Sequence, residues 1–235
     1  MLAVKSPLSF GIHNFVAALL LASLFGCSTT PVDRDSGEID AIEAAQRITK
    51  NRERAARIVR EVMDTVDTED FESIQASIKQ YEVAADLLDE AVKLSSDSLQ
   101  PRLERFEIRK RVADGYQYIY AMLDQQCAPL EEEGLKPAED LLRRRIEARL
   151  LANRWLRLSQ RDMEFHLRNT TIAYQHPRQY WELQQIHVAL GDYRGARTTL
   201  LMMMDQYGPK LSARDRRAAE SRIRLYAQKM IDAEG

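Results

Sequence analysis

The sequence contains few of the residues that interrupt helices or build covalent frameworks. Its 235 residues include 9 glycines, 7 prolines and 2 cysteines, and aromatic residues make up 7 % of the chain. Two cysteines exclude a disulfide framework, and the scarcity of glycine and proline leaves little room for the turns of a β-rich fold. Alanine, leucine, glutamate, arginine and glutamine are abundant instead, and these residues favour helices. The composition therefore predicts an all-α chain.

An excess of either charge is also absent. The chain has 34 lysines and arginines against 36 aspartates and glutamates, which gives a formal charge of −2. A nucleic-acid-binding face or a polybasic membrane surface needs a clear excess of basic residues. We therefore expect no nucleic-acid partner.

Motifs for metal binding, cofactor binding and covalent catalysis are missing. The histidines beyond the N-terminal segment, His166, His176 and His187, are far apart and form no His-x3-His pair. The sequence has no Gly-x-Ser-x-Gly motif, phosphate loop or dinucleotide fingerprint. Glu220-Ser221 matches the catalytic dipeptide of lytic transglycosylases but lacks the glycine-rich motif that follows it in that family. We expect no metal, no cofactor and no enzymatic activity, although acid–base catalysis by two carboxylates stays open.

No apolar run is long enough to cross a membrane comfortably. The run at residues 15–25 falls short of the ~20 residues that a spanning helix needs. It follows one positive charge, Lys5, and has the length of the apolar part of a signal peptide. Residues 24–27 (Leu-Phe-Gly-Cys) resemble the lipobox of bacterial lipoproteins, with an aliphatic residue three before the cysteine and a small residue directly before it. Phe25 is bulkier than the residue usual at its position.

The lipobox resemblance implies a lipid anchor. It implies that residues 1–26 are removed as a lipoprotein signal peptide and that Cys27 carries acyl chains that hold the mature protein in a membrane. Ser28 follows in place of aspartate, which by analogy with known lipoproteins implies the periplasmic face of the outer membrane. Residues 27–37 are polar and turn-rich and predict a flexible tether. The alternatives are an ordinary secretory signal with a chance cysteine and a short anchor helix.

Residues 38–127 predict a long helical hairpin followed by a third helix. The first helix begins near Ser36 and has apolar residues every three or four positions, with Arg52 in one of those positions. A short turn to the second helix predicts an antiparallel hairpin. The third helix is expected to run from Pro101 to about Gln125. The second helix has the unbroken three-and-four spacing of a coiled-coil seam at Phe71, Ile74, Ile78, Tyr81, Ala85, Leu88 and Val92.

A surface loop is expected at residues 127–134, and a second helical region at residues 136–235. Pro137 begins a helix whose outer side is expected to carry six arginines between Arg143 and Arg157. Cys127, which has no cysteine partner in the mature chain, is expected to be a buried, inert thiol; the alternative is a disulfide with another chain. The predicted inward stripe of the helix is Leu142, Ile146, Leu150, Leu151, Trp155 and Leu158.

Residues 178–209 have the pattern of a helix-turn-helix repeat. Tyr180 is the leading aromatic residue, residues 190–193 (Leu-Gly-Asp-Tyr) form the turn, and Ala196 supplies a small residue at the helix crossing. This pattern resembles a tetratricopeptide repeat, a unit of roughly 34 residues. The resemblance implies antiparallel hairpins stacked as a short solenoid, closed by a final helix from about Ser212. The departures from the family pattern are Gln184, His187, Leu200 and Pro209.

Three features are candidate binding residues. The run Arg143, Arg144 and Arg145 would grip an acidic peptide or anionic glycan through bidentate pairs, or else forms a solvated face beside nearby carboxylates. Tyr118 belongs to a tyrosine cluster that would line a peptide groove. Met204 belongs to a run of three methionines that would offer an adaptable apolar contact. Core packing is the alternative for the tyrosine cluster and for the methionines.

Together these patterns predict a membrane-anchored periplasmic lipoprotein that binds an envelope protein as a non-catalytic scaffold. Tetratricopeptide lipoproteins as a class assist outer-membrane assembly, secretin biogenesis or cell-wall synthesis, so the resemblance implies a role in cell-envelope assembly. The alternative is a peptidoglycan-binding or cell-wall-active protein whose arginines meet acidic peptide stems. A third option is self-association, and the oligomeric state stays open.

Overall fold

The structure is a computed structural model that describes residues 41–67, 70–95 and 98–234. These residues belong to the second of the two units into which the chain divides, residues 39–235. The predicted signal peptide, the predicted tether and Cys27 lie outside the described residues.

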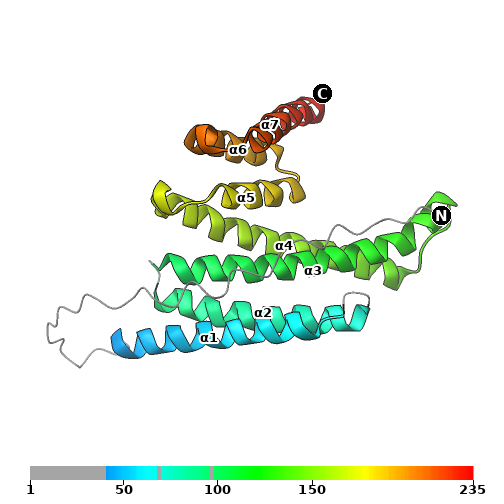
Figure 1. Cartoon of the computed structure of the whole chain (residues 1–235). Coiled ribbons are helices and arrows are strands. Elements are labelled where there is room, and N and C mark those ends of the chain that lie inside the picture. Colours follow the sequence, from blue (N-terminus) through cyan, green and yellow to red (C-terminus); the bar gives the residue numbers. More distant parts are fainter. Residues whose placement is uncertain (1–40, 68–69, 96–97, 235) are drawn as a thin grey trace. The chain divides into compact units, whose positions relative to one another are not determined.

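Every regular element in the described part of the chain is helical, which confirms the predicted all-α fold. Each helix packs mainly against the helices directly before and after it, so that antiparallel hairpins stack in chain order, as the successive layers of Figure 1 show. Two short 3-10 turns, Ile172–Tyr174 and Gly208–Lys210, lie between the later helices. The helices are α1 (Ala41–Thr65), α2 (Phe71–Leu94), α3 (Leu99–Glu132), α4 (Glu139–Asn169), α5 (Pro177–Ala189), α6 (Tyr193–Tyr207) and α7 (Ala213–Glu234).

The N-terminal hairpin, α1 and α2, follows the predicted seam. Asp70 caps α2, because its carboxylate accepts the backbone N–H groups of Glu72 at 3.3 Å and Ser73 at 2.9 Å. Arg52, the one charge in the predicted seam of α1, forms an ion pair with Glu104 of α3 at 2.5 Å. The buried seam residues of α2 are Ile74, Ile78, Tyr81, Ala85, Leu88 and Val92.

The buried apolar residues form two cores. The N-terminal core joins α1, α2, α3 and the first half of α4 and includes Leu88 and Val112. The C-terminal core joins α3 and the second half of α4 to α5, α6 and α7 and includes Tyr180 and Leu200. Trp155 of α4 packs against both cores, so α4 connects the two halves of the stack.

The third helix is longer than predicted. It ends at Glu132 instead of about Gln125, and Pro129 lies inside it. A proline in the last turns of a helix removes one backbone hydrogen bond, and contacts with α4 hold these turns in place. Cys127 is fully buried, as expected for a lone thiol. The loop that was expected at residues 127–134 is therefore a tight turn after Glu132, where Gly134 adopts a positive φ of 72°.

The α5–α6 hairpin occupies the predicted repeat. Gly191 makes the turn with a positive φ of 76°, and Asp192 caps α6 by accepting the N–H of Gly195 at 2.8 Å. The second carboxylate oxygen of Asp192 lies 2.8 Å from Nδ1 of His187, which is buried. Gln184, which replaces the usual small residue, donates to the hydroxyl of Tyr226 on α7 at 2.7 Å. Two of the departures from the repeat pattern, Gln184 and His187, are thus part of the packing between α5, α6 and α7.

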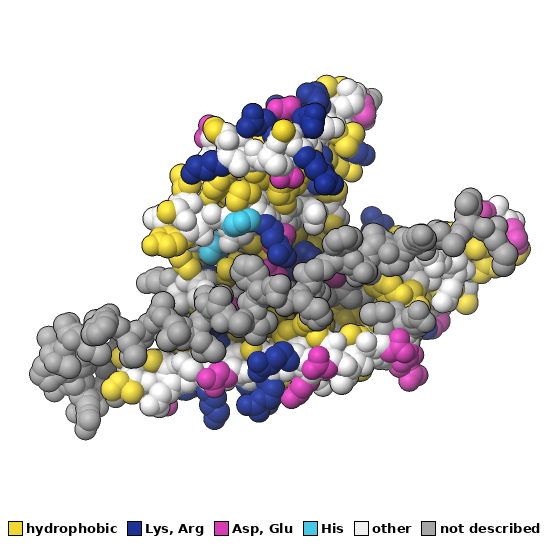
Figure 2. All heavy atoms as spheres, viewed as in Figure 1, with side chains coloured by type: hydrophobic (Ala, Val, Ile, Leu, Met, Phe, Trp, Pro, Cys, Tyr) yellow, Lys and Arg dark blue, Asp and Glu magenta, His cyan; other side chains and the backbone are white. Residues whose placement is uncertain are grey.

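The outer sides of the first and last helices are polar. In Figure 2, acidic and basic side chains are mixed along the outer side of α1, and lysine and arginine side chains lie over the C-terminal helices. In α7, Arg217 and Arg224 are exposed, whereas Ala219 and Tyr226 are buried. This helix closes the C-terminal core, as the solenoid pattern predicts.

Candidate functional site

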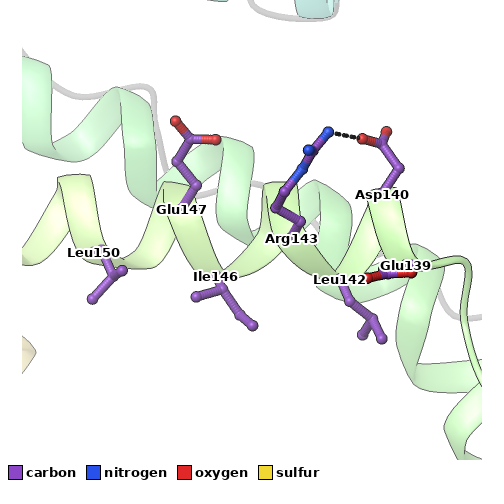
Figure 3. Close-up of a pocket in the computed structure, with 7 residues that line it drawn as sticks. All are labelled: Glu139, Asp140, Leu142, Arg143, Ile146, Glu147 and Leu150. Carbon is purple, nitrogen blue, oxygen red and sulfur yellow. Dashed lines mark hydrogen bonds and ion pairs between the residues drawn. The ribbon is translucent and has the colours of Figure 1, made fainter.

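One face of α4 exposes apolar side chains. Ile146 is 57 % exposed and Leu150 is 64 % exposed, and Leu142 lies half-buried beside them. In Figure 3 these three side chains point in a common direction, while Arg143 and Glu147 leave the other side of the helix. We call the three apolar residues and the charged residues around them the α4 face; its described lining residues are Glu139, Asp140, Leu142, Arg143, Ile146, Glu147 and Leu150.

The structure corrects the predicted orientation of α4. Leu142, Ile146 and Leu150 were expected to point inward, but the buried side of α4 is a different one. Its first half carries the small side chains of Ala148 and Ala152, which let α3 and α4 approach closely there. The first part of the predicted stripe, Leu142, Ile146 and Leu150, therefore faces outward, whereas Trp155 packs against both cores as expected. The buried residues of α4 are Ala148, Ala152, Leu156, Ser159, Asp162, Met163, His166 and Leu167.

The arginine run is spread over three different environments. Arg143 is exposed and pairs with Asp140 at 2.5 Å, and the guanidinium of Arg144 lies 5.4 Å from the centre of the Phe71 ring on α2. Arg145 points toward α3, where it pairs with Glu131 at 2.8 Å. The hydrogen bond to Glu131 raises the pKa of Arg145. The structure does not bring the three guanidinium groups together into one anion-binding site.

Tyr118 and Met204 lie on other helices than the arginine run, on α3 and α6. Tyr118 lies on α3 with 38 % of its surface exposed. Met204 is partly buried against the C-terminal core, where its neighbour Met203 is fully buried, and Met202 is 46 % exposed. Core packing therefore accounts for two of the three methionines. The three sets of predicted binding residues thus lie on three different helices, α3, α4 and α6.

A buried ion network connects α2, α3 and α4. Asp162 of α4, whose side chain is 3 % exposed, accepts hydrogen bonds from Arg105 at 2.5 and 3.0 Å and from Arg109 at 2.9 Å. Asp89 of α2 accepts one further hydrogen bond from each arginine at 2.6 Å. The two positive and two negative charges balance, which is the arrangement that burial of charge requires.

The two arginines of the network have different electrostatic settings. Burial works to lower the pKa of Arg105, but hydrogen bonds and charges of Asp162 and Asp89 outweigh burial and raise the pKa. Burial lowers the pKa of Arg109, whose Nε atom is buried without a hydrogen-bond partner. Sequence reasoning missed this network. Two arginines four residues apart on the inner side of α3 were the available signal.

No group of three or more histidine, cysteine, aspartate or glutamate residues suited to a metal ion occurs in the described part of the chain. His166 lies 3.0 Å from the amide nitrogen of Gln179, and His187 contacts Asp192. Each histidine thus holds neighbouring elements together. Among the residues that the structure describes, no helix combines the length and apolarity needed to cross a membrane.

Comparison with known proteins adds little to this picture. No family model matches the chain, and no curated protein matches it. Among solved structures, a de novo designed helical repeat protein is similar over 83 % of this chain and 96 % of its own length, with 16 % identity and a TM-score of 0.22. A TM-score this low is too weak to assign a fold, so the stacked hairpins rest on the helix contacts described above.

Proposed function

We propose that this chain is a lipid-anchored protein of the cell envelope that acts as a non-catalytic scaffold, binding an amphipathic helix of a partner chain on the α4 face. The observation that carries the proposal is the outward apolar stripe of Leu142, Ile146 and Leu150. The anchor at Cys27 would fix the location, and the tether would give the binding face reach.

The chemistry of the α4 face favours a helix as the bound element. Three apolar residues at four-residue intervals match the anchor spacing of an amphipathic helix lying along α4. Acidic Glu139 stands at one end of the stripe and exposed Arg154 beyond the other. A partner helix with the opposite polarity would satisfy both ends. Exposed apolar patches rimmed by charge are typical of protein–protein interaction sites.

Photocrosslinking in cells tests the proposal. A benzophenone amino acid is placed at Ile146 in the full chain, and a matched control is placed at Leu225 on α7, which is 50 % exposed. We expect protein adducts from position 146 that are absent from position 225, mapped by mass spectrometry to an apolar helical segment. Failure to find any adduct specific to position 146 contradicts the proposal.

Two further variants separate the anchor from the binding face. Cys27→Ala should leave the helical content unchanged and abolish the function in the envelope, because lipid attachment is lost. Ile146→Glu should leave anchoring unchanged but remove the specific adducts. Purified sacculi discriminate the peptidoglycan alternative: release of muropeptides, or pelleting that is lost when Arg143 is changed to Glu, would favour a wall-active protein over the scaffold.

A further inference from the structure

The α4 face is symmetric about Ile146. Leu142 lies four residues before Ile146 and Leu150 lies four residues after it, so Leu142 is rotated about 40° to one side of Ile146 and Leu150 about 40° to the other. An antiparallel copy of the same helix, centred on Ile146, brings Leu142 of one helix opposite Leu150 of the other. The spacing of the apolar residues on the face is therefore the same in both directions along the helix.

The charges around the stripe favour the antiparallel arrangement. Glu139 lies seven residues before Ile146 and Arg154 lies eight after it, so an antiparallel pair places each Glu139 beside Arg154 of the other helix. In the same arrangement, Glu147 of one helix lies opposite residue 145 of the other. Arg143 of that other helix is two residues from this position and lies on the same edge of the stripe. A parallel pair would instead place Glu139 against Glu139 and Arg143 against Arg143, which is unfavourable.

We propose that the α4 face takes a second copy of this chain, with the two α4 helices antiparallel and crossing at Ile146. The inference rests on the proposed function, because it names the first partner of the same helix-binding face. Charge complementarity argues for this occupant, since α4 carries both the acidic and the basic end that a bound helix must match. Among the charged residues that line the face, Glu139, Asp140 and Glu147 outnumber Arg143, and this acidic excess opposes contact with an anionic lipid surface.

The size of the contact indicates a weak pair that the anchor strengthens. The stretch from Glu139 to Arg154 covers 15 helical steps, or about 23 Å of α4. One helix pair of this length belongs to the small class of interfaces that form transient complexes. Two chains anchored in the same membrane meet at a high effective concentration, which compensates for low intrinsic affinity. The pair is therefore best tested in membranes, with the full anchored chain.

Site-specific crosslinking of the full chain in native membranes tests the pairing. In Ile146→Cys chains, a short thiol crosslinker should yield covalent dimers, because residues on a two-fold axis lie next to their own copies. Cys127 is fully buried and stays in place. Leu225→Cys on α7 is the matched control for random collisions. Circular dichroism checks that each exposed substitution leaves the helices intact.

Mixed chains with different tags fix the orientation. When Leu142→Cys chains are mixed with Leu150→Cys chains, the yield of crosslinks between the two variants should be at least as high as that between two Ile146→Cys chains. It should be far higher than the yield between two Leu142→Cys chains. Glu139→Arg should lower the dimer yield about tenfold, since two favourable contacts become repulsive and each tenfold step corresponds to about 1.4 kcal/mol. Adding Arg154→Glu to Glu139→Arg should restore most of the yield.

Each possible outcome decides the question. The self-pairing is overturned if the dimer yield at position 146 is no higher than that of the Leu225→Cys control. If adducts to another protein are still specific to Ile146 in that case, the proposed function stands. Dominant crosslinks between two Leu142→Cys chains overturn the antiparallel arrangement. A charge reversal at Glu139 without effect contradicts the role of charge. Absence of both dimers and other adducts overturns the pairing and the proposed function together.

Discussion

Removing the carboxylate of Asp162 tests whether the buried ion network supports the stack. In Asp162→Ala, the two arginines lose three hydrogen bonds, of 2.5, 2.9 and 3.0 Å. Arg105 and Arg109 then share only Asp89, so one positive charge becomes uncompensated in a region where both side chains are about 10 % exposed or less. Breaking a buried ion pair by removing one partner costs about 3–5 kcal/mol.

That cost should be large enough to measure by thermal and chemical unfolding. For a domain of this size, 1 kcal/mol lowers the melting temperature by about 2–4 °C, so Asp162→Ala should lower it by about 10 °C. Asp89→Ala is the matched control, because it removes two hydrogen bonds from the same arginines. Its side chain is 31 % exposed, so water screens the arginines there, and we expect a loss of only about 1–2 kcal/mol.

The ranking of the two variants is the critical result. If Asp162→Ala loses no more stability than Asp89→Ala, burial does not determine the strength of the network and the reasoning fails. Replacing Arg105, Arg109 and Asp162 together by apolar residues of similar volume should cost less than Asp162→Ala alone, because no unpaired charge is left. A combined variant that is less stable than Asp162→Ala would contradict the same reasoning.

Three further perturbations follow from the described contacts. Gly195→Ala should destabilise the protein by about 1–3 kcal/mol in urea unfolding, because its Cβ would collide with the ring of His187. Gly208→Ala is the control: the new methyl group has open space around it, so this change should not lower the stability. Burial lowers the pKa of His166, so the stability due to its neutral form is present above about pH 6.5 and is lost as the pH falls; melting curves of wild type and His166→Gln should converge in acid. Burial raises the pKa of Tyr116 to about 12, so its ultraviolet titration should lag behind the other tyrosines, and the stability that its protonated form provides should disappear as the pH rises through that value.

The seam of α2 shows what the sequence pattern can predict. Its spacing of three and four places Ile74, Ile78 and Leu88 inward, and all three are buried, because a helix fixes which residues share a side. Arg52 was predicted in a seam position of α1, but its partner Glu104 lies 52 residues away. Pairing at such a distance depends on how helices stack, which periodicity does not encode.

The orientation of α4 shows where the pattern is ambiguous. An apolar stripe marks a surface that avoids water, but the same stripe fits a core and an interface equally well. The buried side of α4 was hidden from pattern reasoning because it contains Ala148, Ala152 and a charged residue, Asp162. Small residues permit close packing, and the charge is tolerated because Arg105 and Arg109 reach it from α3. Pro129 was also expected to lie in a loop after α3, but it lies inside the helix, because tertiary contacts outweigh the effect of a local helix breaker.

The position of Trp155 between the two cores gives the molecule an internal fluorescent reporter. The chain has only 2 tryptophans, and the other, Trp181, packs in the C-terminal core, with the Arg222 guanidinium of α7 5.0 Å from its ring centre. In a linear stack, each layer is stabilised only by its neighbours, so opening can begin at one end. Detachment of α7 would change the emission of Trp181 first, while the emission of Trp155 would change when α4 separates from either core.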